Sequence, residues 1–348
     1  MVHALALCLL SLLPPIPQQP TPPPAAAQAP ARGLHVLRTF AVGGEGAWDY
    51  VTIDSEARRL YVPRSTRVLV LDADTGKQVG EIGDTAGVHG VALAPEFGRG
   101  FTSNGRANTC TVFDLKSGKT LQTVATGRNP DALVYEPVTK CVFLGDGSSK
   151  EVTVISADTL KVEATIAVGG KPEALAVDGH GKVFVNIEDT SEVLRIDARQ
   201  HTVEQRMALA PGEEPTGLAI DAEHHTLFAT CHNEFMVVLD GGTGKVLATP
   251  AIGKRTDGAA FDAKSGRAFS ANGDGTLTVV DTRGDKPFTV VENVPTLPGA
   301  RTLAFDPKTE QIYLPTAQYE PAPADASSGG RRRPAMKPDS FQIVVVGR

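Results

Sequence analysis

The chain has one tryptophan, Trp48, and aromatic residues make up only 5% of its 348 residues. No apolar run reaches the roughly 18 to 20 residues that a helix needs to span a bilayer. We therefore expect no transmembrane span in the chain that remains if the N-terminal leader described below is removed. No stretch keeps the 3.6-residue apolar period of an amphipathic helix, and this absence argues against a helical fold.

Cysteine is scarce as well: only Cys8, Cys110, Cys141 and Cys231 are present, and no two of them form a C-x-x-C pair. An odd number of widely spaced cysteines beyond the N-terminal stretch argues against a disulfide framework or a structural zinc site, and favours buried thiols. The sequence also lacks H-E-x-x-H, EF-hand and G-x-S-x-G motifs. From motifs alone we therefore predict no metal and no cofactor.

Positive charge is not in excess, because the formal net charge is -6. Such a balance gives no general attraction to nucleic acid and argues against nucleic acid as a partner. The hydrophobic content of 41% is enough for a large globular core.

The N-terminal residues differ from the rest of the chain. The apolar segment "ALALCLLSLL" (Ala4–Leu13) has the length of a signal-peptide core, and Ala27-Gln28-Ala29 fits an A-x-A cleavage site. We therefore predict that residues 1–30 are a signal peptide with a Pro/Ala-rich leader, and that the protein is periplasmic or secreted. The alternative is a disordered, Pro-rich leader without a targeting role.

A repeated unit of 40 to 44 residues fills the remaining chain. Each unit has four short β-like runs, and the first run, built from small residues, ends at an anchor position: Asp54, Ala94, Glu136, Asp178, Asp221, Asp262 and Asp306. The second run carries an aromatic residue at a fixed place: Tyr61, Phe101, Phe143, Phe184, Phe228, Phe269 and Tyr313. A period in the low forties is typical of the blades of a β-propeller.

The seventh unit begins near Arg301 and stops after "FQIVVVG", which leaves it one strand short. The N-terminal "HVLRTFAVG" has the pattern of a fourth strand without a unit of its own. We therefore predict an all-β, seven-bladed β-propeller over residues 34–348, with four antiparallel strands per blade and the N-terminal strand closing the last blade. We expect a monomer.

The segments "VGGKPEALAVD", "LYV" and "VLVLDADTGKQVGEI" resemble the YVTN-repeat propellers, and the chain from about Leu34 looks like a YncE-like protein. The resemblance implies an extracytoplasmic location and a role in binding or surface association. Some relatives are reported to bind DNA, and related propellers form domains of redox enzymes. The matching residues belong to turns and packing contacts, so they indicate the fold far better than the function.

Two loops of every blade meet around one mouth of the central channel of a propeller. Five residues before each anchor lies a polar slot: Asp49, His89, Asp131, Glu173, Thr216, Asp257 and Arg301. The loop between the second and third strands adds Arg64, Asn104, Asp146, Glu188, His232 and Asn272. We predict that these residues, apart from Thr216, bind a ligand, although an Asp at such a place often caps a turn. Opposed carboxylates would lie too far apart to share a metal ion, so only neighbours such as His89 with Asp49 or Asp131 could do so.

A long insertion at residues 318–340, which includes "GGRRRP", is predicted to be mobile and to lie over the mouth. The favoured function is a non-enzymatic scaffold that binds a small molecule or a protein at this face. One alternative is a metal-assisted lyase or hydrolase in which His89 is the base or a ligand and Arg301 stabilises negative charge. Another is nucleic-acid binding through arginines: Arg64, Arg106, Arg128, Arg301 and Arg331 to Arg333.

Overall fold

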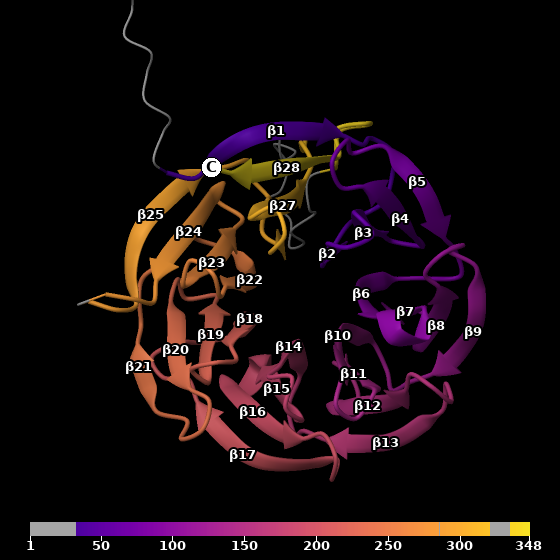
Figure 1. The fold of residues 1–348 in the computed structure, drawn as a ribbon, viewed down its shortest axis with the longest axis horizontal. Helices are drawn as coiled ribbons and strands as arrows, with labels where there is room; N and C mark the ends of the chain where they lie inside the picture. The colour runs from indigo at the N-terminus through magenta and orange to yellow at the C-terminus, as the bar shows by residue number, and fades with distance from the viewer. Residues whose placement is uncertain (1–32, 285, 321–334) are drawn as a thin grey trace, which may run out of the picture. The chain divides into compact units, whose positions relative to one another are not determined.

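The computed structural model describes residues 33–284, 286–320 and 335–348. They belong to one compact unit, Gly33–Arg348, while the separate unit Met1–Arg32, which holds the predicted leader, lies outside the described residues. Within Gly33–Arg348, seven four-stranded antiparallel sheets surround a central axis (Figure 1). The predicted seven-bladed β-propeller is therefore confirmed.

The first three blades follow one another in chain order. They are β2 (Thr52–Asp54), β3 (Arg59–Arg64), β4 (Arg67–Asp72) and β5 (Gln78–Ile82); β6 (Val88–Ala94), β7 (Arg99–Asn104), β8 (Thr109–Asp114) and β9 (Thr120–Ala125); and β10 (Pro130–Glu136), β11 (Cys141–Asp146), β12 (Glu151–Ser156) and β13 (Val162–Ala167).

The next three blades repeat the plan. They are β14 (Pro172–Val177), β15 (Lys182–Ile187), β16 (Glu192–Asp197) and β17 (Thr202–Ala208); β18 (Pro215–Asp221), β19 (Thr226–Cys231), β20 (Met236–Asp240) and β21 (Val246–Ala248); and β22 (Thr256–Asp262), β23 (Arg267–Asn272), β24 (Thr276–Asp281) and β25 (Thr289–Pro295). The helices among the described residues are two 3₁₀ turns, η1 (Pro95–Phe97) and η2 (Glu188–Thr190), so no helix in this part of the chain could span a membrane.

The seventh blade is built from both ends of Gly33–Arg348. Its strands are β26 (Ala304–Asp306), β27 (Gln311–Thr316), β28 (Gln342–Gly347) and the N-terminal β1 (His35–Ala41). β1 pairs antiparallel with β28, from His35 opposite Gly347 to Ala41 opposite Gln342. This pairing confirms the predicted ring closure, and it satisfies a sheet edge that would otherwise remain open.

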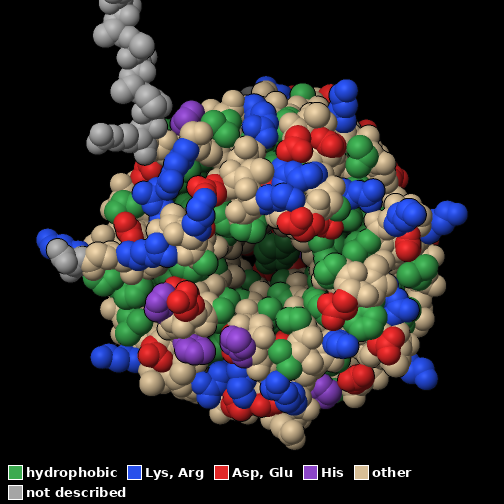
Figure 2. All heavy atoms as spheres, in the orientation of Figure 1, with side chains coloured by type: hydrophobic (Ala, Val, Ile, Leu, Met, Phe, Trp, Pro, Cys, Tyr) green, Lys and Arg blue, Asp and Glu red, His purple; other side chains and the backbone are tan. Residues whose placement is uncertain are grey.

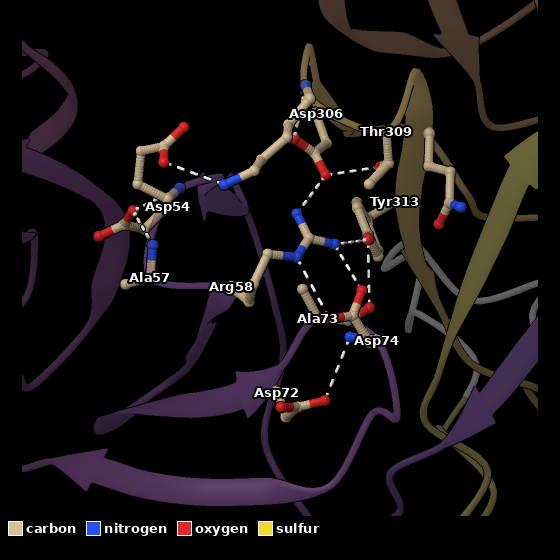
Figure 3. Close-up of polar contacts among 12 residues, drawn as sticks. Asp54, Ala57, Arg58, Asp72, Ala73, Asp74, Asp306, Thr309 and Tyr313 are labelled. Carbon is tan, nitrogen blue, oxygen red and sulfur yellow. Dashed lines mark hydrogen bonds and ion pairs between the residues drawn. The ribbon is translucent and has the colours of Figure 1, made fainter.

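Side chains reinforce the junction between the seventh and first blades (Figure 3). Arg58, in the turn after β2, donates to Asp306 at 2.5 Å and to Asp74 at 2.7 Å. The Tyr313 hydroxyl donates to the Ala73 carbonyl at 3.1 Å. Asp306 is fully buried, so this contact joins blades that are far apart in sequence through a charge pair shielded from water.

The core lies between adjacent blades, where side chains of one sheet pack on those of the next. Every aromatic residue at the fixed place of the second strand is buried: Tyr61, Phe101, Phe143, Phe184, Phe228, Phe269 and Tyr313. Such flat side chains fill the wedge-shaped gap between two sheets. The aromatic stacking of Phe228 on Phe261, with ring centroids 5.3 Å apart, is one example.

The two ends of the predicted insertion pair with each other. Tyr319 and Met336 form an antiparallel bridge, and the backbone N–H of Lys337 donates to the Gln318 carbonyl at 2.8 Å. The predicted segment between them, residues 321–334, lies outside the described residues.

The innermost strands surround a central channel that is visible as a hollow lined by hydrophobic side chains (Figure 2). A cavity of about 130 Å³ lies within it. Branched aliphatic residues from corresponding positions of five blades line this cavity: Val91, Leu133, Leu175, Leu218 and Leu303. The adjacent charged groups therefore border on an apolar space, where a charge is poorly solvated.

Candidate functional site at the channel mouth

The polar slot predicted from the repeats lies where the innermost strands begin. His89, Asp131, Glu173 and Asp257 each occupy the second position of β6, β10, β14 and β22. The pairing of each of these strands with the next is irregular at this point, with a register shift between Val88 and Val91 in the first case. A β-bulge changes the direction of side chains relative to a regular β-sheet. Here the bulges lie at the start of each strand, at the four charged residues.

Three residues from adjacent blades form the tightest group at the mouth. His89 Nδ1 lies 2.7 Å from Asp49 Oδ2 and 3.4 Å from Asp131 Oδ1. Asp49 and His89 also line a cavity of about 310 Å³ that Trp48, Arg106 and other residues complete. The structure therefore brings together the neighbours that the sequence had suggested.

Asp131 is the least satisfied member of this group. Its side chain belongs to a residue that is only 7% exposed, and its Oδ1 accepts no hydrogen bond from any residue that the structure describes. The contact with His89 at 3.4 Å is an ion pair, while the His89 Nδ1 proton is directed at Asp49. A buried carboxylate without a hydrogen-bond partner is costly, so its presence needs an explanation.

The other cations at the mouth already have acidic partners. Arg301 Nε lies 2.7 Å from Asp257 Oδ2. Lys171 lies 3.0 Å from Glu173 and also contacts Glu188 closely. His89 contacts both Asp49 and Asp131, so these two carboxylates share one cationic partner among the ion pairs that the described residues form.

Tyr50 reaches across the mouth from the first blade to the fourth. Its hydroxyl donates to Glu173 Oε1 at 3.1 Å, and its side chain lines the apolar channel. Burial raises the pKa of the Tyr50 hydroxyl well above its usual value, and the charge of Glu173 adds to the effect. The Tyr50 hydroxyl thus remains protonated and able to donate a hydrogen bond. Its bond to Glu173 links the first and fourth blades, which are not neighbours in the ring.

Burial next to the apolar channel raises the pKa of three carboxyl groups at the mouth. The pKa of Asp131 rises to about 7, that of Glu173 to about 8 and that of Asp257 to about 6. Burial is the main cause in each, while His89, Lys171 and Arg301 respectively oppose the rise. Several poorly solvated carboxylates at one place favour a bound cation.

Burial alone would lower the pKa of His89, but the hydrogen bond to Asp49 and the charges of Asp131 and Asp49 outweigh it and raise the pKa to about 9. At neutral pH His89 therefore keeps its proton. A general base and a metal ligand both need a free lone pair on the ring, so His89 would have to release its Nδ1 proton before it could serve as either.

The predicted residues of the second loop mostly have structural contacts. Arg64 is fully buried, donates to the carbonyls of Gly43, Gly44 and Gly46, and lies over the Phe341 ring at 3.8 Å. Its guanidinium thus fixes the loop before β2 and is unavailable to a ligand or to nucleic acid.

Three more residues of that loop bond within their own hairpins. Asn104 donates to Thr109 and Thr111, and Asn272 donates to Thr276 and Thr278. Asp146 accepts from Thr153 at 2.6 Å. Of the second-loop set, Glu188 joins the cluster through Lys171, and His232 pairs with Glu214 at 3.2 Å.

Sequence reasoning missed Tyr50 and Lys171. A signal for Tyr50 existed, because the position after the slot is occupied by small residues in the other blades: Gly90, Ala132, Ala174, Gly217, Gly258 and Thr302. A tyrosine at that place departs from the repeat. Lys171 has no comparable signal, since its role depends on where its flexible side chain ends.

No family model matches the chain, and neither does any curated protein sequence. Solved structures do match. Kuenenia stuttgartiensis hydrazine synthase is similar over 76% of this chain and 91% of its own, with a TM-score of 0.68 and 14% identity. U3-55K is similar over 89% of this chain and 98% of its own, with a TM-score of 0.72 and 11% identity. At such identities the likeness supports the propeller fold alone.

Proposed function

We propose that the protein is a non-catalytic propeller scaffold that binds a cationic ligand at the channel mouth. The observation that carries the proposal is Asp131, a 7% exposed carboxylate whose Oδ1 accepts no hydrogen bond from a described residue and which shares His89 with Asp49. A positive group entering the mouth would gain the Coulombic energy that the protein leaves unused.

The proposal includes two expectations from the sequence. Export rests on the apolar segment Ala4–Leu13 and the A-x-A site, and membership of the YVTN-repeat propellers rests on the repeated "VGG" and "DADTGK" patterns. A scaffold with a charged mouth is compatible with both, because the fold leaves the loop residues free to vary.

Thermal unfolding with a small panel of probes tests this function. Putrescine, methylguanidinium, Zn²⁺ and Mn²⁺ represent cations, and succinate and phosphate represent anions. We expect at least one cation to raise the unfolding temperature by an amount that grows with the logarithm of its concentration above Kd, and no anion to do so.

Two variants locate the effect. Asp257→Asn, at the mouth, should weaken stabilisation by an organic cation, whereas Asp240→Asn, whose carboxylate bonds the turn after β20, should leave it unchanged. Stabilisation by anions only, or by no probe at all, would overturn the proposal.

A further inference from the structure

The group formed by Asp49, His89 and Asp131 has the features of a metal site. One ligand atom from each residue can be chosen so that all three atoms lie within 4.8 Å of one another. The set combines an imidazole nitrogen with two carboxylate oxygens, which are donors that first-row transition ions accept. We propose that this group binds a divalent transition-metal ion. This inference rests on the proposed function, because it names one cation that the mouth would bind.

The distances fit an ion with little rearrangement. A tetrahedral Zn²⁺ at about 2.0 to 2.2 Å from each donor places the donors about 3.4 Å apart. His89 Nδ1 and Asp131 Oδ1 are already 3.4 Å apart, and His89 Nδ1 and Asp49 Oδ2 are 2.7 Å apart. The metal takes the place of the proton between His89 and Asp49, this proton is released to the solvent, and the two side chains separate by a small rotation.

A second observation points to a ligand independently of the cluster. Asp131 is more than nine-tenths buried, and its Oδ1 accepts no hydrogen bond from the described residues. The close ion pairs of Lys171 and Arg301 are with Glu173 and Asp257 rather than with Asp131. A metal ion would satisfy both carboxylates of the group at once.

The histidine is also held in place from behind. A Cβ atom added at Gly105 would lie 2.7 Å from His89 Nε2 and 2.9 Å from Asn129 Oδ1, so the imidazole packs directly on this glycine. The packing limits rotation of the ring and keeps Nδ1 directed at the two carboxylates. A rigid donor is what a metal site requires of its ligands.

Access to the group is open from the mouth. Asp49 and His89 line the cavity of about 310 Å³ at the start of the innermost strands, so an ion and its remaining water ligands can enter there. This inference departs from the motif-based prediction of no metal. The donors come from three blades at separations of 40 and 42 residues, which no short metal-binding motif describes.

Binding of Zn²⁺ measured by calorimetry on the full-length, chelator-treated protein tests the inference, with Co²⁺ absorption as a probe of the coordinating atoms. We expect one ion per chain, and at least tenfold weaker binding in His89→Gln and in Asp131→Asn. Gly105→Ala should weaken binding too, although it removes no ligand.

His224→Gln is the matched control. His224 Nδ1 lies 2.8 Å from Asp221, a similar pair at the other end of an innermost strand, with no third ligand among the described residues. The His224→Gln variant should bind Zn²⁺ with the same affinity as the unaltered protein. Circular dichroism confirms that each variant is folded.

The outcomes separate this inference from the proposed function. If Zn²⁺ and Co²⁺ do not bind, or bind equally to Asp131→Asn, the metal site is wrong. Stabilisation by putrescine or methylguanidinium that Asp257→Asn weakens would then still support a cationic ligand. If neither metal ions nor organic cations bind, both proposals fail.

Discussion

The two ends of the innermost strands both carry carboxylates, yet the protein holds them differently. At the end away from the mouth, Glu136 accepts from the backbone N–H groups of Val138 and Thr139 at 3.1 and 2.7 Å. At the mouth, the Oδ1 of Asp131, five residues earlier on the same strand, accepts no hydrogen bond from the described residues. The Glu136 carboxylate thus stabilises a turn, whereas the Asp131 Oδ1 atom keeps its capacity to accept a hydrogen bond.

The pKa values show the same difference. Burial would raise the pKa of Asp306, but hydrogen bonds from Ser55, Thr309 and Arg58 outweigh it and lower the pKa below its usual value. Burial raises the pKa of Asp131 to about 7, because His89 opposes it only in part. The supply of hydrogen-bond partners, rather than the residue type, thus sets the direction in which burial leaves the pKa of these two carboxyl groups.

The largest expected effect is at the structural end. Asp306→Ala should lower the free energy of unfolding by about 3 kcal/mol, because it leaves Arg58 without its buried partner and removes bonds to the turn after β26. Chemical denaturation measures the change.

Asp74→Ala is the control, since it removes the other carboxylate that Arg58 contacts, whose side chain is 57% exposed. We expect a loss of at most about 1 kcal/mol. Equal losses of unfolding free energy in Asp306→Ala and Asp74→Ala would mean that burial does not determine how much each contact with Arg58 stabilises the protein.

A smaller effect should appear in the pH dependence at the mouth. The pKa of Glu173 in the folded protein is about 8, above its usual value of 4.5, so its contribution to stability is present below pH 4.5 and is lost as the pH rises through 8. The charged and titratable groups that act on it include Lys171, Asp131, Asp257, Tyr50 and His89.

Thermal unfolding from pH 4.5 to 8 measures this contribution. The unfolding temperature of the unaltered protein should fall over this range, and that of Glu173→Gln should fall less. Parallel curves for the two proteins would contradict an unfavourable charge on Glu173.

The repeat made the architecture predictable. Anchors at intervals of 40 to 44 residues gave the number of blades, and the unpaired "HVLRTFAVG" gave the closing strand, because both depend on backbone pairing and apolar pattern. The repeat also predicted that the slot residues share one end of the channel, since equivalent positions of a propeller are brought together by its symmetry.

Side-chain direction was not predictable in the same way. Arg64 and Asp146 occupy equivalent loop positions, yet each bonds to its own surroundings and is buried. Tyr50 crosses the mouth, and Lys171 pairs with two acids, because tertiary contacts decide where a long side chain ends. The sequence therefore located the mouth but could not separate binding residues from structural ones.

The most direct test of the comparison is the free energy of unfolding of two matched variants, measured with a chelator at pH 7.5. Asp262→Asn changes a carboxylate that accepts from Lys264 N–H at 3.0 Å and from Ser265, whereas Asp131→Asn changes the unsatisfied one. We predict that Asp262→Asn destabilises the protein by about 1 kcal/mol and that Asp131→Asn stabilises it by about 1 kcal/mol. A loss of stability in Asp131→Asn as large as that in Asp262→Asn would show that the mouth carboxylate is structural, and would contradict the account.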